Sequence, residues 1–277
     1  MRTLLILLLA LLTTGMHAQP VTVMSYNIRL DTEADGINQW PHRTHKMIAL
    51  IKKSNPDLLG VQEALHNQMQ DLQNQLPEYS YVGVGRDDGK EKGEYSAIFY
   101  KKDRFEVLTQ NTFWLSETPH VPGSKSWDAA ITRVVTWAIL KEKTSGKKFL
   151  YANTHFDHIG KEARKNSALL IKQTLAALPQ AQKLPVLVSG DFNSEPSEAP
   201  YQTMVDGKIL RLADARPAND TTGTFCGFEL NKIPCRTIDY IFHSAKWKTL
   251  SYWVLADNDG SYYPSDHLPV LATFTLK

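Results

Sequence analysis

The segment PVLVSGDFN, residues 185–193, joins a short apolar run to two polar side chains. The apolar run is typical of a strand that is covered on both faces, because it leaves no polar side for solvent. Asp191 and Asn193 follow directly, where such a strand is expected to end. The segment therefore predicts a buried strand in a layered fold, with polar groups at the edge of its sheet.

The same pattern of short strands recurs along the chain and alternates with helical spacing. Strands are predicted at 21–28, 57–63, 94–101, 105–115, 131–141, 148–157, 237–244, 250–258 and 262–276, and helices at 43–54, 66–76 and 161–178. Strands outnumber helices, and several strands are apolar on both faces. We therefore predict an α/β fold in which two sheets pack face to face with helices outside.

Polar side chains stand at the ends of six of the predicted strands or close to them. They are Asn27, Glu63, His155 with Asp157, Asp191 with Asn193, Asp239, and Asp266 with His267. One such residue usually caps a turn, but six sets of carboxylate, amide and imidazole groups indicate one converging site. Carboxylate and carboxamide oxygens suit hard cations such as Mg²⁺, Mn²⁺ or Ca²⁺. The sequence has no HExxH, GxSxG, P-loop or GxGxxG motif, which argues against a zinc site, a serine hydrolase, a kinase and a dehydrogenase.

These motifs together resemble those of the endonuclease/exonuclease/phosphatase superfamily, the deoxyribonuclease-like group. The matching segments are SYNI, VQE, NTH, GDFN, IDYIF and SDHLPV, which occur in the family order between residues 24 and 270. The resemblance implies a four-layered α/β sandwich, with two packed mixed β-sheets flanked by helices. It also implies divalent-metal dependence and the hydrolysis of phosphoester bonds.

The resemblance assigns the metal to three residues. Glu63 is expected to be the principal ligand, helped by Asn27 and Asp266. The expected ion is Mg²⁺, with Mn²⁺ or Ca²⁺ as alternatives. Mg²⁺ takes only one or two carboxylates and keeps several waters, which leaves room for a substrate phosphate.

The resemblance gives catalytic roles to five residues. Asp191 is expected to be the general base or to orient the attacking water, and Asn193 to donate its amide to a phosphate oxygen. His267, paired with Asp239, is expected to bind phosphate or to act as acid or base, because a carboxylate partner raises the pKa of an imidazole. His155 is expected to bind the phosphate charge or to protonate the leaving oxygen.

Three further residues are weaker candidates for substrate binding. Arg133 resembles a phosphate-contacting arginine of part of the family, but an exposed strand arginine explains it equally well. Tyr95 is expected either to reach the phosphate or to lie in the core. Trp127, in the long loop 116–130, is expected either to stack on a base or sugar or to anchor that loop.

The sequence favours a phosphodiesterase or nuclease that acts by in-line attack of an activated water. The alternatives are a phosphomonoesterase, a sphingomyelinase-like enzyme that acts on lipid headgroups, and a non-catalytic module that binds phosphate ligands. GDFNSEP differs from the GDxNYR pattern typical of inositide 5-phosphatases, and a formal charge of only +2 lends no support to a long polyanion as ligand. The expected partner is thus a phosphoester, whether nucleic acid, nucleotide, lipid headgroup or sugar phosphate, and no stable protein partner is indicated.

The first 18 residues have the layout of a secretory signal peptide, with Arg2, an apolar run at 4–12 and a small polar segment that ends at Ala18. The run is too short to span a membrane. We therefore expect an exported protein, periplasmic or extracellular, in which residues 19–277 form a single catalytic domain. Cys226 and Cys235 are expected to form a disulfide, with two free thiols as the alternative.

Overall fold

The computed structural model describes residues 19–179, 183–231 and 233–277, so the expected signal segment 1–18 lies outside the described residues. Two six-stranded sheets form the centre of the molecule. The first has the order β11-β12-β1-β2-β4-β3, with β1 Val21–Asn27, β2 Leu58–Ala64, β3 Tyr79–Val82, β4 Tyr95–Lys101, β11 Trp247–Val254 and β12 Val270–Leu276. The second has the order β5-β6-β7-β8-β10-β9, with β5 Phe105–Trp114, β6 Val134–Glu142, β7 Lys148–His155, β8 Val186–Asp191, β9 Leu212–Asp214 and β10 Asp239–Ser244.

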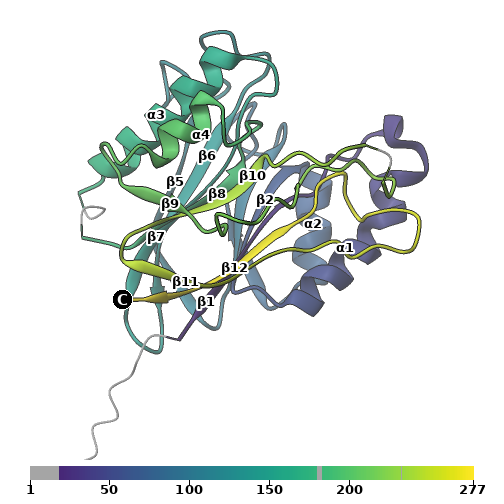
Figure 1. Ribbon diagram of the computed structural model, residues 1–277, viewed down its shortest axis with the longest axis horizontal. Helices are drawn as coiled ribbons and strands as arrows, with labels where there is room; N and C mark the ends of the chain where they lie inside the picture. The colour runs from purple at the N-terminus through teal and green to yellow at the C-terminus, as the bar shows by residue number, and fades with distance from the viewer. Residues whose placement is uncertain (1–18, 180–182, 232) are drawn as a thin grey trace, which may run out of the picture.

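Helices cover the outer face of each sheet (Figure 1). The short helix η1 (Glu33–Asn38) leads into α1 (Trp40–Ser54), and α1 and α2 (His66–Gln75) pack on the first sheet. The helices α3 (Lys161–Ala177) and α4 (Ala199–Val205) pack on the second sheet. Both sheets are mixed, because the pairs β1–β2 and β7–β8 are parallel while their neighbours are antiparallel. The predicted four-layered sandwich is confirmed.

The alternation of side chains along each central strand leads from the core to a polar edge. In β8, Val186 and Val188 pack under the outer helices, whereas Leu187 lies in the apolar cluster between the sheets. Ser189 and Asp191 follow Leu187 on the same inward row, because successive side chains of a strand point to opposite faces. The inward row therefore becomes polar toward one end of the strand, and that end carries the site.

A buried layer of polar side chains separates the apolar core from this end. The amide nitrogen of Asn153 on β7 donates across the sheet interface to the carbonyl oxygens of Val61 and Ala97, both at 2.9 Å. Its oxygen accepts from Gln62 at 2.7 Å and from the hydroxyl of Ser189 at 3.0 Å. Asn153 is fully buried and thus uses its whole hydrogen-bonding capacity to hold the two sheets in register.

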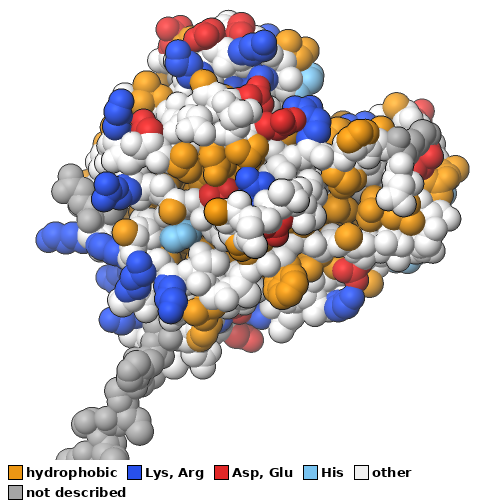
Figure 2. All heavy atoms as spheres, in the orientation of Figure 1, with side chains coloured by type: hydrophobic (Ala, Val, Ile, Leu, Met, Phe, Trp, Pro, Cys, Tyr) orange, Lys and Arg blue, Asp and Glu red, His pale blue; other side chains and the backbone are white. Residues whose placement is uncertain are grey.

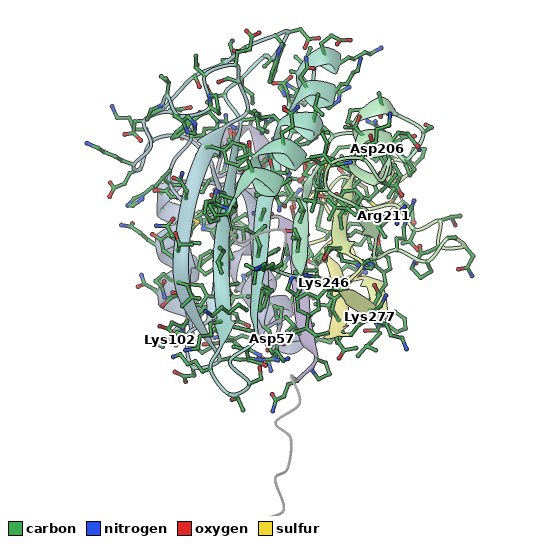
Figure 3. All side chains as sticks on the ribbon, turned by 90° about the vertical axis from the view of Figure 1, so that its left-hand side faces the viewer. Asp57, Lys102, Asp206, Arg211, Lys246 and Lys277 are labelled. Atoms are coloured by element: carbon green, nitrogen blue, oxygen red, sulfur yellow. A yellow bond between two sulfur atoms is a disulfide. The ribbon has the colours of Figure 1, made fainter. Side chains whose placement is uncertain are left out.

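Charges of both signs are mixed over the upper part of the face seen in Figure 2, and basic side chains gather at the edge near the C-terminus. Arg211, Lys246 and Lys277 lie on that side of the molecule (Figure 3), and they adjoin β9, β11 and β12 in the sequence. None of these three lines the site pocket described below. No helix among the described residues is both long and apolar enough to cross a bilayer. The expected disulfide between Cys226 and Cys235 is confirmed.

Candidate active site

A pocket of about 410 Å³ lies at the polar end of the two sheets. The predicted site residues that line it are Glu63, Arg133, His155, Asp191, Asn193, Asp266 and His267. Asn27 and Asp239 are fully buried beneath these residues and bind them by hydrogen bonds. The structure thus brings together nine of the residues that the sequence analysis selected, from both sheets.

The strand pairing explains how residues that are distant in sequence meet here. His155 at the end of β7 is the registered partner of Asp191 at the end of the parallel strand β8. Asp239 begins β10 and is the registered partner of Asp191 on the other side, because β10 is antiparallel to β8. Three chemical groups on three adjacent strands therefore lie side by side, whether they end or begin their strands.

Unusual backbone conformations carry two side chains into the pocket. Glu63 has a φ of 65° at a point where the pairing of β2 with β4 shifts register, and Asn193 has a φ of 45° just after β8. Residues other than glycine rarely adopt such values, and strain of this kind concentrates at functional sites. Gly190 precedes the turn with a φ of 156°, and a Cβ there would lie 2.3 Å from the carbonyl oxygen of Thr154. The close approach of β7 and β8 at the site therefore depends on this glycine.

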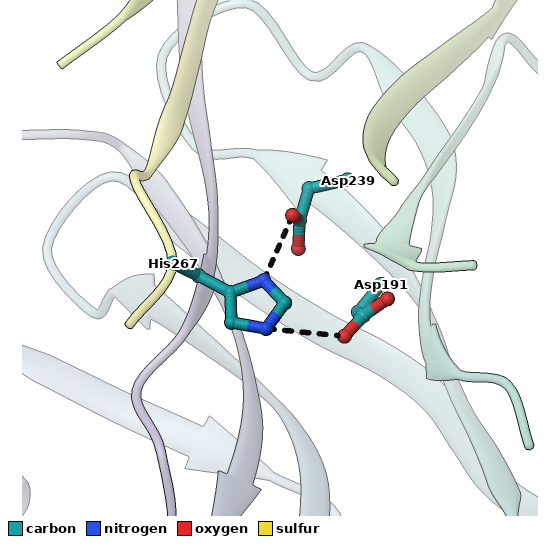
Figure 4. Close-up of side chains that lie close together, drawn as sticks. All are labelled: Asp191, Asp239 and His267. Atoms are coloured by element: carbon teal, nitrogen blue, oxygen red, sulfur yellow. Dashed lines mark hydrogen bonds and ion pairs between the residues drawn. The ribbon is translucent and has the colours of Figure 1, made fainter. Parts of the chain in front are cut away.

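His267 lies between two carboxylates (Figure 4). Its Nδ1 is 2.9 Å from Oδ2 of Asp239, and its Nε2 is 3.7 Å from Oδ2 of Asp191. Burial alone would lower the pKa of His267, but the charges of Asp239 and Asp191 outweigh it and raise the pKa to about 10. His267 is therefore an imidazolium at neutral pH, and it presents a fixed positive charge to the pocket.

Asp191 is placed to accept a proton near neutral pH. Its Oδ1 accepts from the backbone amide of Asn193 at 2.8 Å, and its Oδ2 accepts from the side-chain amide of Asn27 at 3.0 Å. Burial and the neighbouring charge of Asp239 raise its pKa to about 7, although His267 acts in the opposite direction. A general base works best when its pKa is close to the working pH, which is the condition that Asp191 meets.

His155 is held as a neutral hydrogen-bond donor. Arg133 places Nη1 at 2.7 Å from Nδ1 of His155, and a guanidinium can only donate, so Nδ1 accepts. The proton of the ring is then on Nε2, which lies 3.3 Å from the acceptor Oδ2 of Asp191, while the amide nitrogen of Asn193 donates to the carbonyl oxygen of Phe156 at 3.0 Å. Burial and the charge of Arg133 hold the pKa of His155 well below its usual value. Arg133 thus contacts His155 directly, besides lining the pocket.

Glu63 and Asp266 provide an oxygen-rich wall that fits a divalent cation. Burial alone would raise the pKa of Glu63, but a hydrogen bond from Asn27 at 3.0 Å and the charge of His267 hold it below its usual value. Burial and the charge of Glu63 raise the pKa of Asp266. Two half-buried carboxylates, of which Glu63 disfavours the charge of Asp266, are the donor set that a hard cation would stabilise. Glu63 and Asp266, with Asn27 beside them, are therefore the residues that would hold the ion.

A second group, Asp191, Asp239 and His267, also offers ligand atoms within 4.8 Å of one another. His267 is a weak ligand in this group, because its Nδ1 donates to Asp239 and its raised pKa keeps the ring protonated. Metal binding requires a neutral imidazole. Oδ1 of Asp239 is buried without a hydrogen-bond partner among the described residues, which leaves that carboxylate strongly dependent on His267.

Two weaker candidates lie apart from the pocket lining. The hydroxyl of Tyr95 donates to the carbonyl oxygen of Lys90 at 3.0 Å and lies 3.2 Å from Nδ1 of His66. Trp127 has a φ of 56° and is half-buried, next to Asp128, whose carboxylate accepts from the first turn of α3. Neither side chain lines the pocket, so the geometry agrees with the structural alternative for each.

The sequence analysis did not select five pocket residues that carry a charge or an aromatic ring: Arg29, Glu94, His158, Phe225 and Arg236. Arg29 had a usable signal, because it stands two residues after Asn27, whereas Glu94 directly precedes β4, at the beginning of a strand rather than at its end. For Phe225 and Arg236 the signal was the expected disulfide, because each adjoins one of its cysteines in the loop that precedes Asp239.

Comparison with known proteins identifies the family. Residues 24–267 match the model of the Endonuclease/Exonuclease/phosphatase family. The chain belongs to this family. Members hydrolyse phosphoester bonds and depend on divalent metal, so the predicted class of phosphoester hydrolase is confirmed.

Solved structures of similar bacterial proteins share the fold over almost the whole chain. An endonuclease/exonuclease/phosphatase from Bacteroides vulgatus is 41% identical, with coverage of 94% of this chain and 100% of that chain and a TM-score of 0.87. A mannosyl-6-phosphatase from Bacteroides thetaiotaomicron is 37% identical, with coverage of 92% and 100% and a TM-score of 0.87. Nocturnin of Drosophila melanogaster is 26% identical over 86% of this chain, but the match spans only 42% of Nocturnin.

Proposed function

We propose that this family member is a metal-dependent phosphomonoesterase that acts on small phosphorylated molecules, with sugar phosphates as the substrate class. The observation that carries the proposal is the charge balance of the pocket, in which the arginines of the wall already have acidic partners. These pairs are Arg29–Asp35 at 2.9 Å, Arg236–Glu195 at 2.8 Å and Arg133–Glu94 at 3.6 Å. Proteins that bind nucleic acid instead leave several cations available for successive phosphates.

The size and setting of the pocket support the same proposal. Its volume of about 410 Å³ is in the range of small-molecule sites. Segments of both sheets surround it, with Arg29 and Glu63 on one side and Arg133 and Asn193 on the other. The basic cluster of Arg211, Lys246 and Lys277 lies elsewhere and does not extend this pocket into a track for a longer polyanion.

The geometry supports direct attack of water on phosphorus. Asp191 takes a proton from the water, whose oxygen bonds to phosphorus while the bond to the organic oxygen breaks. The imidazolium of His267 and the Nε2 proton of His155 face the charge that builds on the phosphoryl oxygens. The departing oxygen takes a proton, and His267 is the group that holds one at working pH. The products are inorganic phosphate and an alcohol.

A cation held by Glu63 and Asp266, with Asn27 beside them, would supply Lewis-acid polarisation of the phosphoryl group. The contribution of the chain is to keep Glu63 ionised, through the hydrogen bonds that it accepts from Asn27 at 3.0 Å and from the backbone amide of Leu30 at 3.1 Å. Mg²⁺ is the proposed ion, because the donors are oxygens and few.

The similarity to a mannosyl-6-phosphatase adds weight to a monoester, although the sequence patterns favour a phosphodiesterase or nuclease. That relative is 37% identical and matches along its whole length, whereas Nocturnin is 26% identical and is matched over less than half of its length.

We further propose export of the chain, with residues 1–18 as the signal and 19–277 as one catalytic domain. A disulfide at Cys226–Cys235 supports an oxidising compartment.

A substrate panel on the wild-type protein tests the proposal. The panel comprises hexose 6-phosphates, nucleoside monophosphates, bis-p-nitrophenyl phosphate, single-stranded DNA and RNA, and sphingomyelin, each with Mg²⁺ and with EDTA. We expect the highest kcat/KM with a hexose phosphate and no turnover with EDTA. A higher kcat/KM with a diester would overturn the monoesterase assignment and favour the phosphodiesterase alternative.

A further inference from the structure

Two side chains at the mouth of the pocket have no part in the chemistry described above. We infer that Phe225 and Arg236, here called the rim pair, bind the organic part of the substrate and select a sugar ring. This inference rests on the proposed function and specifies how the same pocket would recognise its substrate class. Both residues line the pocket, and both directly adjoin the disulfide Cys226–Cys235.

The backbone fixes the two members of the rim pair to each other. The amide of Phe225 donates to the carbonyl oxygen of Arg236, and the amide of Arg236 donates to that of Phe225, both at 2.9 Å. The disulfide joins the next residue on each side, so it closes the same pairing covalently. The rim pair is therefore held by an isolated β-bridge between two loop segments, and its backbone loses little freedom when a ligand binds.

The rim pair is also attached to the catalytic segment. The amide of Cys226 donates to the carbonyl oxygen of Asp266 at 3.0 Å, and the amide of Leu268 donates to the carbonyl oxygen of Thr224. The ring of Phe225 lies 4.9 Å from the ring of His267, measured between centroids. Any group esterified to a phosphate that is bound at His267 therefore lies close to the Phe225 ring.

The chemistry of the rim pair matches a sugar ring. Phe225 is half-buried and offers an aromatic surface for an apolar C–H face. Arg236 donates through Nε to Glu195 at 2.8 Å, and among the described residues its remaining guanidinium donors have no other partner. A sugar hydroxyl group both donates and accepts hydrogen bonds. The guanidinium of Arg236 can donate to it, and the adjacent carboxylate of Glu195 can accept from it.

The test separates contacts with the sugar from contacts with the phosphate. For Phe225→Ala and Arg236→Ala, the KM for the preferred hexose 6-phosphate and the competitive inhibition constant of inorganic phosphate are measured. We expect KM to rise about tenfold, as for the loss of a charged hydrogen bond or a stacked ring. The inhibition constant of inorganic phosphate should stay within about twofold of wild type for Arg236→Ala, because Arg236 pairs with Glu195 and not with His267. For Phe225→Ala, whose ring adjoins that of His267, this constant should rise less than KM does.

A matched control and a disulfide variant complete the design. Arg211→Ala removes an exposed arginine outside the pocket and should change neither constant. The double variant Cys226→Ala with Cys235→Ala should raise KM in the same direction as Arg236→Ala, since it loosens the pairing of the rim. Arg236 is exposed, so its variant tests the inference even if the cysteine variant does not fold.

Two results would overturn the inference. The first is an unchanged KM for the hexose phosphate in both rim variants, and the second is an equal rise in KM and in the inhibition constant of phosphate. If the wild-type panel shows no turnover of hexose phosphates, the proposed function itself has failed, and the inference falls with it. The two failures are distinguishable, because the panel tests the proposed function on the wild-type protein alone, whereas the inference is tested on the rim variants.

Discussion

The space between the two sheets has one apolar end and one polar end, and the same strands contribute side chains to both. At one end Val23, Leu58 and Leu187 belong to an apolar cluster that closes the core. At the other end Asn27 and Asp191, on the same inward rows of β1 and β8, are buried beside each other with 3.0 Å between their polar atoms. A few residues along one strand therefore separate a position that stabilises the fold from one that we propose for catalysis.

This difference shows how a folded chain tolerates buried charge. The apolar end gains free energy from burial, about 25 cal/mol per Å² of apolar surface. The polar end costs free energy, which the chain limits through hydrogen bonds and by pairing each carboxylate with a donor. Asn153 and Ser189 form the boundary between the two ends, and with Gln62 they make a layer of polar but uncharged side chains.

The largest expected effect is on catalysis at the polar end. Asp191→Asn should lower kcat by about a thousandfold, because the general base is lost. The free energy of unfolding should stay within about 1 kcal/mol of wild type, since a buried charge and a hydrogen bond from Asn27 are removed together. Steady-state kinetics and urea unfolding provide the two readouts. A kcat near that of wild type would exclude Asp191 as the base.

A substitution at Leu187, four residues before Asp191 on β8, should instead lower stability and leave catalysis unchanged. Leu187→Ala should lower the free energy of unfolding by about 2–5 kcal/mol, because the side chain is fully buried between the sheets. The kcat of the folded fraction should remain within about twofold of wild type, as the change lies away from the pocket. A large loss of kcat in fully folded protein would show that the two ends are coupled.

Changes at the boundary should affect both properties. Asn153→Ala leaves the carbonyl oxygens of Val61 and Ala97 without their donor, and we expect a loss of about 2–3 kcal/mol in the free energy of unfolding. Because Val61 adjoins the strand segment that carries Glu63, the activity at low Mg²⁺ should fall more than at saturating Mg²⁺. Thr22→Ala, at the far end of β1, serves as a control that should leave the Mg²⁺ dependence unchanged. Equal losses of activity at low and at saturating Mg²⁺ would show that Asn153 contributes to stability alone.

The smallest expected effect is on the pH dependence of kcat/KM, which is set by the titratable groups of the polar end. The rate should rise as Asp191 loses its proton around its pKa of about 7 and fall as His267 loses its proton around its pKa of about 10. The charge of Asp239 raises both values, so Asp239→Asn should move both limbs of the kcat/KM profile to lower pH, by roughly one unit. Movement of the limbs in opposite directions would contradict a shared effect of Asp239.

Sequence reasoning predicted the layered fold and most of the site, because polar residues interrupt apolar strands at recognisable points. Asp191 and His155 end strands that are apolar up to that point, so their positions stand out. Glu94 did not stand out, because it precedes its strand and the signal was sought chiefly after strands. The reason is topological, since an antiparallel strand brings its beginning to the edge where its neighbour ends.

The sequence by itself determined most of the strands and helices, though not β3, β9 or α4, and it determined the polar groups at the strand ends. Its motifs also indicated phosphoester hydrolysis as the class of chemistry. These features are local, because they depend on periodicity and on residue type. Only the tertiary structure decided that Arg133 holds the tautomer of His155, that Asp239 lies in register with Asp191, and that Phe225 and Arg236 form the mouth of the pocket. These relations depend on contacts between segments far apart in the chain, and no local pattern in a single sequence specifies which distant groups will meet.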